Sequence, residues 1–383
     1  MPQHFLMDNQ TLFKDPGVFE FDYTPDTISY RDMQLRELAT HLRPALRGGH
    51  PVNTILHGPP GTGKTTCVRE IFTEIEEITS HVVTVFVNCE SVRTPFRVFA
   101  TIFRRLFGHQ PSLSGIPTER LTDPIASELI KRKAVLIVCL DDANYLGSNG
   151  HPGEILRYLL RMHEAYPGVK IGVVSTVNTR TDYHLALLDP STRSVYQPYL
   201  ISCPPYGAEE VRGILHDRVQ AGLYEGVVPS GMLDLITALT IEEGDLRVGI
   251  SLLRLAAAAA EQAARTVVQE QDVRNSFQAA HGAHLIQLVE ALKPDEQRLL
   301  SHIAEMKQKD ADVPVTSGTL YASFKETTKV SYTVFHTRLT RLADLRLIEL
   351  IRPSVRGNTR EVVLRGDPEM MMEMCRTEKC GLV

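Results

Sequence analysis

The chain has 383 residues, which is enough for two or three domains of typical size. Its hydrophobic content of 43% is ordinary for a globular protein, and its net charge of −5 excludes nucleic-acid binding through overall positive charge. No apolar run approaches the ~18 residues that a membrane span needs. The first ten residues lack the layout of a signal peptide, so we expect a cytoplasmic protein with no membrane partner. The scattered cysteines form no CxxC pair, which leaves no sign of a zinc or redox site.

The N-terminal half alternates short apolar strands with helices. Strands are predicted at 52–58, 82–89, 134–142 and 169–176, and helices near 65–77, 95–107, 122–132 and 153–166. Strands that are apolar throughout and separated by helices are typical of a parallel sheet with helices on both faces. The sequence therefore predicts an α/β domain over residues 1–205.

The pattern changes twice after residue 205. From 208 to about 281 the periodicity is helical throughout, which predicts an all-helical second domain over 206–283. Beyond it, helical patterns are followed by two strands at 348–364 around a Gly-Asn turn. Residues 284–383 are therefore predicted to form a helical domain that ends in a hairpin.

A phosphate-binding loop joins the first strand to the first helix after it. Gly58, Gly63, Lys64 and Thr65 fill the pattern GxxxxGK[ST] within GPPGTGKTT. The glycines let backbone N–H groups face phosphates, and the helix adds its positive N-terminal end. Lys64 is expected to reach the β- and γ-phosphates of ATP or ADP, and Thr65 to hold Mg²⁺. The other loop residues expected at the nucleotide are Gly61, Thr62 and Thr66.

Two carboxylates end the apolar strand at 134–142. Asp141 is expected to orient Mg²⁺ through water, and Asp142 to polarise the attacking water. An ordinary strand-end turn is the alternative. The second acid of such a site is usually Glu, and Asp is one methylene shorter, so we expect slow hydrolysis.

These motifs, in this order, resemble an AAA+ ATPase. Three more specific stretches resemble the archaeal origin-recognition initiators: the segment 13–53 before the P-loop, VNCESVRTPFRVFATI at 87–102, and the GDLR helix within 242–261. The resemblance covers essentially the whole chain. It implies an AAA+ base domain, an all-helical lid and a C-terminal winged-helix domain.

The resemblance also assigns roles to further residues. Arg247, in GDLR, matches the sensor-2 arginine that reaches from the lid to the γ-phosphate. Tyr206 and Arg218 match positions that line the nucleotide pocket, although a hinge aromatic and a surface charge are the alternatives. Tyr30 and Arg31 fall where the family's N-terminal segment wraps the adenine.

Two positions depart from the family's pattern. Sensor 1 is usually Asn, but here Thr176 takes its place and Asn178 is a rival. The arginine finger is expected directly after LDP, where this chain has Ser191, and Arg193 is the nearest arginine. Both departures favour a nucleotide switch over a fast ATPase.

The window 325–365 is locally basic, with a net charge of +5 from nine basic and four acidic residues. It holds an amphipathic helix and then the basic hairpin, which is the layout of a winged helix, with a solvated basic face as the alternative. The residues expected at DNA are Arg338, Arg341, Arg356, Asn358 and Arg360.

The resemblance implies a replication initiator that binds double-stranded origin DNA under ATP control and recruits or loads the MCM helicase. Self-association, or association with a paralogue, is a further expectation. Two alternatives stay open: a signalling ATPase that carries a winged helix, and a clamp-loader or remodelling subunit whose C-terminal domain contacts only protein.

Overall fold

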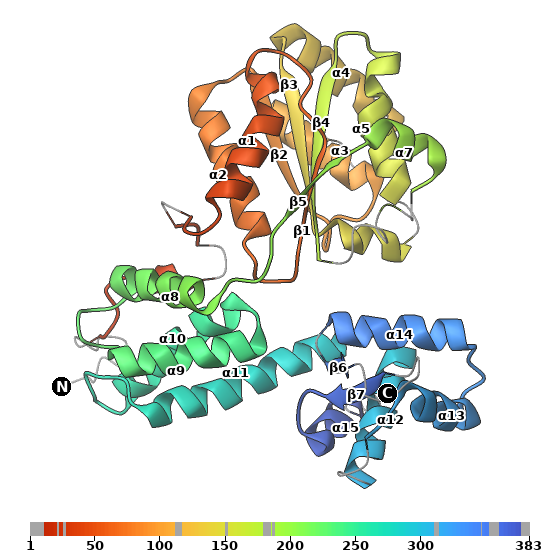
Figure 1. Ribbon diagram of the computed structural model, residues 1–383. Coiled ribbons are helices and arrows are strands. Elements are labelled where there is room, and N and C mark those ends of the chain that lie inside the picture. The colour runs from red at the N-terminus through yellow and green to blue at the C-terminus, as the bar shows by residue number, and fades with distance from the viewer. Residues whose placement is uncertain are drawn as a thin grey trace, which may run out of the picture. The chain divides into compact units, whose positions relative to one another are not determined.

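The chain divides into two compact units, Met1–Val273 and Arg274–Val383. The computed structural model describes residues 11–20, 23–25, 28–111, 117–149, 152–178, 185, 188–309, 314–345, 347–351 and 360–376. The boundary between the units falls inside one helix, α11 (Glu270–Glu290). Figure 1 labels the elements of each unit.

Unit 1 contains a five-stranded parallel sheet in the order β2–β3–β4–β1–β5. The strands are β1 (Thr54–His57), β2 (Val82–Asn88), β3 (Val135–Asp141), β4 (Lys170–Val177) and β5 (Tyr199–Ser202). Their positions confirm the predicted parallel sheet, and β5 is an edge strand that the sequence pattern did not indicate. Because the strands are parallel, the carboxyl ends of β1, β3 and β4 meet at one edge of the sheet.

Helices cover both faces of this sheet (Figure 1). They are α1 (Asp32–Leu46), α2 (Lys64–Ile78), α3 (Pro95–Phe107), α4 (Glu119–Arg132), α5 (Pro152–Ala165) and the short α7 (Pro190–Tyr196), with a 3₁₀ helix, η2 (Ala143–Asn149), after β3. Two cores result: α1 and α2 pack against residues such as Ile137, whereas α3, α4 and α5 pack against its neighbour Leu136. Successive side chains of a strand point to opposite faces, so one apolar run supplies both cores.

A helical layer completes unit 1, and the N-terminal segment packs onto it. The layer consists of α8 (Ala208–Gly222), α9 (Ser230–Glu243), α10 (Leu246–Gln262) and the start of α11. A 3₁₀ turn, η1 (Pro16–Phe19), contacts α8 and α10, and the backbone N–H groups of Lys14 and Asp15 both donate to the carbonyl of Gly222. The described residues 11–20 therefore lie on the helical layer, although they precede the sheet in sequence.

Unit 2 has the expected helices and hairpin. After α11 come α12 (Pro294–Lys309), α13 (Ser317–Thr327), α14 (Tyr332–Asp344), β6 (Ile348–Ile351), β7 (Glu361–Leu364) and α15 (Pro368–Arg376). The strands β6 and β7 pair antiparallel, which confirms the predicted hairpin. Phe335, Leu339 and Leu342 of α14 are buried in the core, as their helical spacing predicted.

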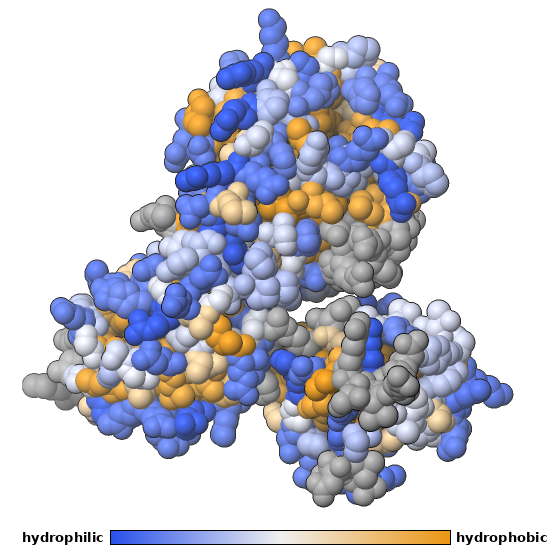
Figure 2. Space-filling model, in the orientation of Figure 1, coloured by the Kyte–Doolittle hydropathy of each residue, from blue (hydrophilic) through white to orange (hydrophobic). Residues whose placement is uncertain are grey.

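Hydrophilic residues cover most of the visible face of each unit (Figure 2). Within the described part of the chain, every helix is too short or too polar to cross a membrane. A surface of this kind is typical of units that pack their apolar residues inward.

Candidate functional site

The P-loop curls because two of its glycines adopt backbone conformations with positive φ. Gly61 has φ of 71° and Gly63 has φ of 80°. Close neighbours also require glycine: a Cβ on Gly61 would lie 2.1 Å from Asp245 Oδ1, and one on Gly63 would lie 2.7 Å from Tyr206 Oη. The loop thus lies directly against Asp245, at the start of α10 in the helical layer, and against Tyr206, in the segment that leads to this layer. The helical layer is the predicted lid.

Lys64 is buried at the start of α2. Its Nζ donates to the carbonyls of Gly58 and Pro59 at 2.8 and 2.7 Å. The pKa of this ammonium is lowered to about 8, chiefly by burial; the carboxylate of Asp142 opposes the lowering, and the charge of Arg247 adds to it. Lys64 is therefore a cation whose charge phosphates would stabilise.

Thr65 and Asp141 are in direct contact, as their motifs predicted for a shared metal site. The Thr65 hydroxyl donates to the Asp141 carboxylate at 2.9 Å to Oδ1 and 3.1 Å to Oδ2. The strand order places β4 between β1 and β3, and Thr176 of β4 donates to Asp141 Oδ1 at 2.6 Å. Hydroxyl and carboxylate oxygens suit Mg²⁺, which takes its other ligands from water and phosphates.

Asp142 is fixed by two contacts beside this pair. Its backbone has φ of 52°, its N–H donates to Thr176 Oγ1 at 2.8 Å, and its Oδ1 accepts from Asn178 Nδ2 at 2.7 Å. Burial raises its pKa, and the neighbouring Asp141 raises it further. The hydroxyl of Thr176 thus contacts both aspartates, whereas Asn178 holds the carboxylate of Asp142.

Arg247 lies near the phosphate side of the site, at the start of α10. Its backbone N–H donates to the capping carboxylate of Asp245 at 2.9 Å, and its side chain is exposed. Its charge lowers the pKa of both Lys64 and Asp142, so its electrostatic field reaches the P-loop and the paired carboxylates.

Tyr206 and Arg218 occupy different surroundings. Tyr206 lies over the P-loop and stacks under the guanidinium of Arg31, with 3.8 Å from Cζ to the ring centroid. Arg218 donates to the carbonyl of Val18 at 2.8 Å and lies 4.4 Å over the ring of Tyr23, so its described contacts join α8 to the N-terminal segment. Its role at the nucleotide stays a prediction.

Arg193 lies on the exposed side of α7. Its Nη2 donates to the carbonyl of Leu185 at 2.5 Å, within the same stretch of chain. An arginine finger acts on the nucleotide of a neighbouring subunit, and contacts inside one chain do not test such a role. The role of Arg193 as an arginine finger therefore stays a prediction.

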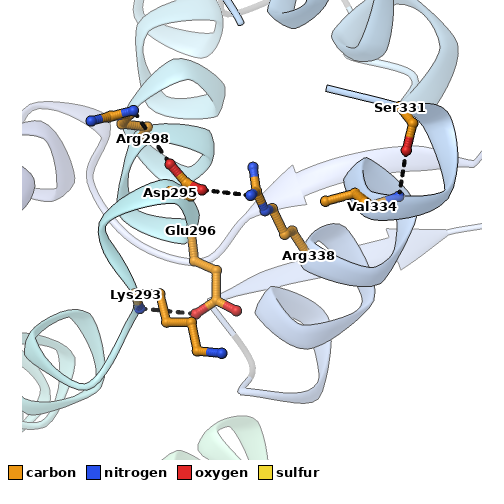
Figure 3. A network of polar contacts seen from close by, with 7 residues as sticks. All are labelled: Lys293, Asp295, Glu296, Arg298, Ser331, Val334 and Arg338. Carbon is orange, nitrogen blue, oxygen red and sulfur yellow. Dashed lines mark hydrogen bonds and ion pairs between the residues drawn. The ribbon is translucent and has the colours of Figure 1, made fainter. Parts of the chain in front are cut away.

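The two arginines of α14 differ in their surroundings within unit 2, and Figure 3 shows the contact of Arg338. Arg338 donates to Asp295 of α12 at 2.6 Å, and its side chain is only 19% exposed. Arg341 Nε lies 3.3 Å from the Glu296 carboxylate of the same helix without making a hydrogen bond, and its side chain is 43% exposed. Arg360 is exposed, and its backbone is tied to Ser317 of α13. The hairpin residues Arg356 and Asn358 lie outside the described residues.

The N-terminal half of α14 presents other residues to solvent. Tyr332, Thr333, Val334, His336 and Thr337 are exposed, and Lys325 and Lys329 are exposed just before the helix. A helix that enters the major groove of DNA reads bases with its N-terminal residues. The polar face of α14 and the winged-helix layout predicted the arginines as DNA contacts, and no signal in the sequence indicated that Asp295 of α12 would accept a bond from Arg338.

The sheet order, the P-loop with its paired carboxylates and the helical lid define an ATPase of the AAA+ class. Two family models agree: the AAA ATPase domain matches residues 28–173, and the Cdc6 AAA+ ATPase-type lid domain matches residues 212–278. The chain belongs to the family of ORC1-type DNA replication proteins. It is 40% identical over 366 residues to the ORC1-type DNA replication protein 2 of Methanosarcina mazei, covering 95% of this chain and 96% of that one.

Solved structures agree with this assignment. The ORC1 protein of Aeropyrum pernix, solved in complex with DNA, is 26% identical with a TM-score of 0.70, over 96% of this chain and 97% of that one. The ORC2 protein of the same organism, solved with ADPNP and ADP, has the same fold, with 24% identity and a TM-score of 0.74 over 96% of this chain and 98% of that one. The predicted resemblance and fold class are confirmed.

Proposed function

We propose that this protein is an ATP-switched replication initiator that acts in the cytosol. Unit 1 binds ATP or ADP with Mg²⁺, unit 2 binds double-stranded origin DNA, and the ATP-bound protein recruits or loads the MCM helicase. Family membership supports the role in replication initiation. The observation that carries the DNA part of the proposal is the exposed N-terminal half of α14, which follows α13 as a recognition helix follows its partner.

At the nucleotide site, the P-loop amides and Lys64 bind the polyphosphate, and Thr65 and Asp141 hold the Mg²⁺. The Mg²⁺ would neutralise charge on the phosphates. Asp142 orients the water that attacks, and Asn178 fixes the position of its carboxylate. Arg247 reports the presence of the γ-phosphate to the lid through its charge.

At the DNA site, the exposed residues make the main contacts; Arg341 and Arg360 stay among the expected contacts, whereas Arg338 is paired with Asp295. Thr333, His336 and Thr337 are placed to meet base edges, and Lys325 and Lys329 to neutralise phosphates. Arg338 orients α14 by its bond to Asp295, because its side chain is only 19% exposed and is held against α12.

The salt dependence of duplex binding tests this assignment. Log K should fall linearly with log salt, and Lys325→Ala with Lys329→Ala should reduce the slope by up to ~0.9 for each phosphate that the variant no longer neutralises. Lys131→Ala is the control, since Lys131 lies in the last turn of α4, far along the chain from unit 2. Full-chain protein that binds no duplex at low salt would contradict the proposal and favour a C-terminal domain that contacts protein.

A further inference from the structure

Arg31 is a buried cation that has no anionic partner among the described residues. It is 3% exposed. Each of its donor nitrogens bonds a backbone carbonyl: Nε to Thr62 at 3.0 Å, Nη1 to Tyr30 at 3.2 Å and Nη2 to Pro204 at 2.6 Å. Burying a charge without a counter-charge is costly, even where carbonyl dipoles offset part of the cost. Such a group is kept for a reason other than stability alone.

The three carbonyls belong to three different segments of the chain. Thr62 lies in the P-loop. Pro204 lies in the stretch that leads from β5 to α8, and Tyr30 lies in the N-terminal segment that runs from the helical layer to α1. The chain therefore crosses between the sheet and the lid helices twice, once in the segment with Tyr30 and once in the segment with Pro204. Arg31 bonds each of these two crossings, and it also bonds the P-loop at Thr62.

Two tyrosines beside Arg31 contact the P-loop and the lid. Tyr206, stacked against Arg31, places its hydroxyl 2.7 Å from the position of a Cβ on Gly63. Tyr30 places its hydroxyl 2.1 Å from the position of a Cβ on Gly213, inside α8. Glycine inside a helix is destabilising relative to alanine, so Gly213 leaves room for Tyr30 at a cost to the helix.

We propose that Arg31 is a positioning residue that couples nucleotide in the P-loop to the position of the lid. It touches no nucleotide in this role. Negative charge on the bound polyphosphate stabilises the buried guanidinium and tightens its bond to the Thr62 carbonyl, and the bonds to Tyr30 and Pro204 then fix both crossings. This inference rests on nucleotide binding by the P-loop, as proposed above.

The test compares full-chain wild type with Arg31→Gln, Arg31→Lys and the control Arg36→Gln, which removes an exposed arginine of α1, the helix that Arg31 precedes. Two quantities are measured: the Kd for ATP, and the slowing of amide hydrogen exchange that ATP causes in peptides containing Tyr30 or Tyr206. Wild type and Arg36→Gln should show the slowing. Arg31→Gln should lose it and bind ATP about tenfold more weakly, as expected for hydrogen bonds to a charged group.

Arg31→Lys separates the effect of the positive charge from that of the planar guanidinium. If Arg31→Gln does not fold, Arg31→Lys alone tests the proposal. The ammonium keeps the charge, so ATP affinity should stay near that of wild type, but it lacks the planar fork and so should lose the slowing of exchange. A variant that is merely less stable, with wild-type slowing by ATP, would overturn the proposal. Wild type that fails to bind ATP would instead overturn the proposed nucleotide site.

Discussion

Lys64 links the chemistry of the P-loop to pH. Its pKa is about 8 because it is buried, whereas bound phosphates would raise it. Below pH 8 the protein already carries the proton. Above pH 8 it must take one up on binding, so nucleotide affinity should fall as pH rises, by up to about tenfold per pH unit.

The measurement is the Kd for ADP between pH 7.5 and 9.5. Lys64→Arg is the matched control, because arginine stays charged over this range and its pH profile should be flat. A wild-type affinity that does not change up to pH 9.5 would contradict a lowered pKa for Lys64.

Asp142 should limit the rate of ATP hydrolysis. Its short side chain is held by Asn178 at 2.7 Å, and its backbone has φ of 52°. We expect a turnover below about 1 s⁻¹, at the slow end of enzymes in general. As pH falls, activity should be lost at a higher pH than an ordinary aspartate would give, since the pKa of Asp142 is raised. Steady-state phosphate release measures both the turnover and its dependence on pH.

Two variants check that the slow ATP hydrolysis takes place at this site. Asp142→Asn should remove most of it, whereas Asp123→Asn, on the exposed side of α4, should leave it unchanged. Turnover well above 1 s⁻¹ in wild type would show that the shorter carboxylate places water correctly after all.

The motifs predicted some of these contacts and left others open. The meeting of Thr65 and Asp141 follows from motif spacing alone. The choice between Thr176 and Asn178 does not, because it depends on how the side chains at and just after the end of β4 meet the two aspartates. The bonds of Arg31 carry no sequence signal, since its partners are backbone carbonyls that any residue can supply.

At the scale of elements, the bond between α12 and α14 decides how α14 is oriented. Arg338→Gln removes the 2.6 Å bond to Asp295. Because Asp295 is half exposed, the free energy of unfolding should fall by only about 1 kcal/mol. Duplex affinity should fall by the same factor at every salt concentration, leaving the slope of log K against log salt unchanged.

Asp295→Asn is the matched control for this pair. It removes the negative charge that holds Arg338 and so weakens the same bond, and the slope should steepen by up to ~0.9 if the released guanidinium reaches a phosphate. A flatter slope with Arg338→Gln would instead place Arg338 at the DNA backbone.

Elements were easier to predict from the sequence than their arrangement. The apolar strands and the helix α14 follow from residue periodicity. The edge strand β5 was missed because it has only four residues, which is too short a run for periodicity to identify. The strand order was also beyond reach, since pairing is set by tertiary contacts and not by local pattern.

At the scale of the whole molecule, the N-terminal segment is part of the structure of the lid. Phe19 is 2% exposed and packs where a Cβ on Gly222 would lie 2.4 Å from its ring. Phe19→Ala should lower the free energy of unfolding of unit 1 by about 3 kcal/mol. Denaturant titration measures this, with Tyr224→Ala, a 54% exposed residue that follows α8, as the control.

The central claim is that nucleotide in unit 1 controls the binding of duplex DNA by the whole chain. A footprint on origin DNA tests it most directly, with ATP, with ADP, and with ATP added to Lys64→Ala. We predict strong protection with ATP, weaker protection with ADP, and a Lys64→Ala footprint that ATP does not change. Identical footprints under all three conditions would contradict this claim.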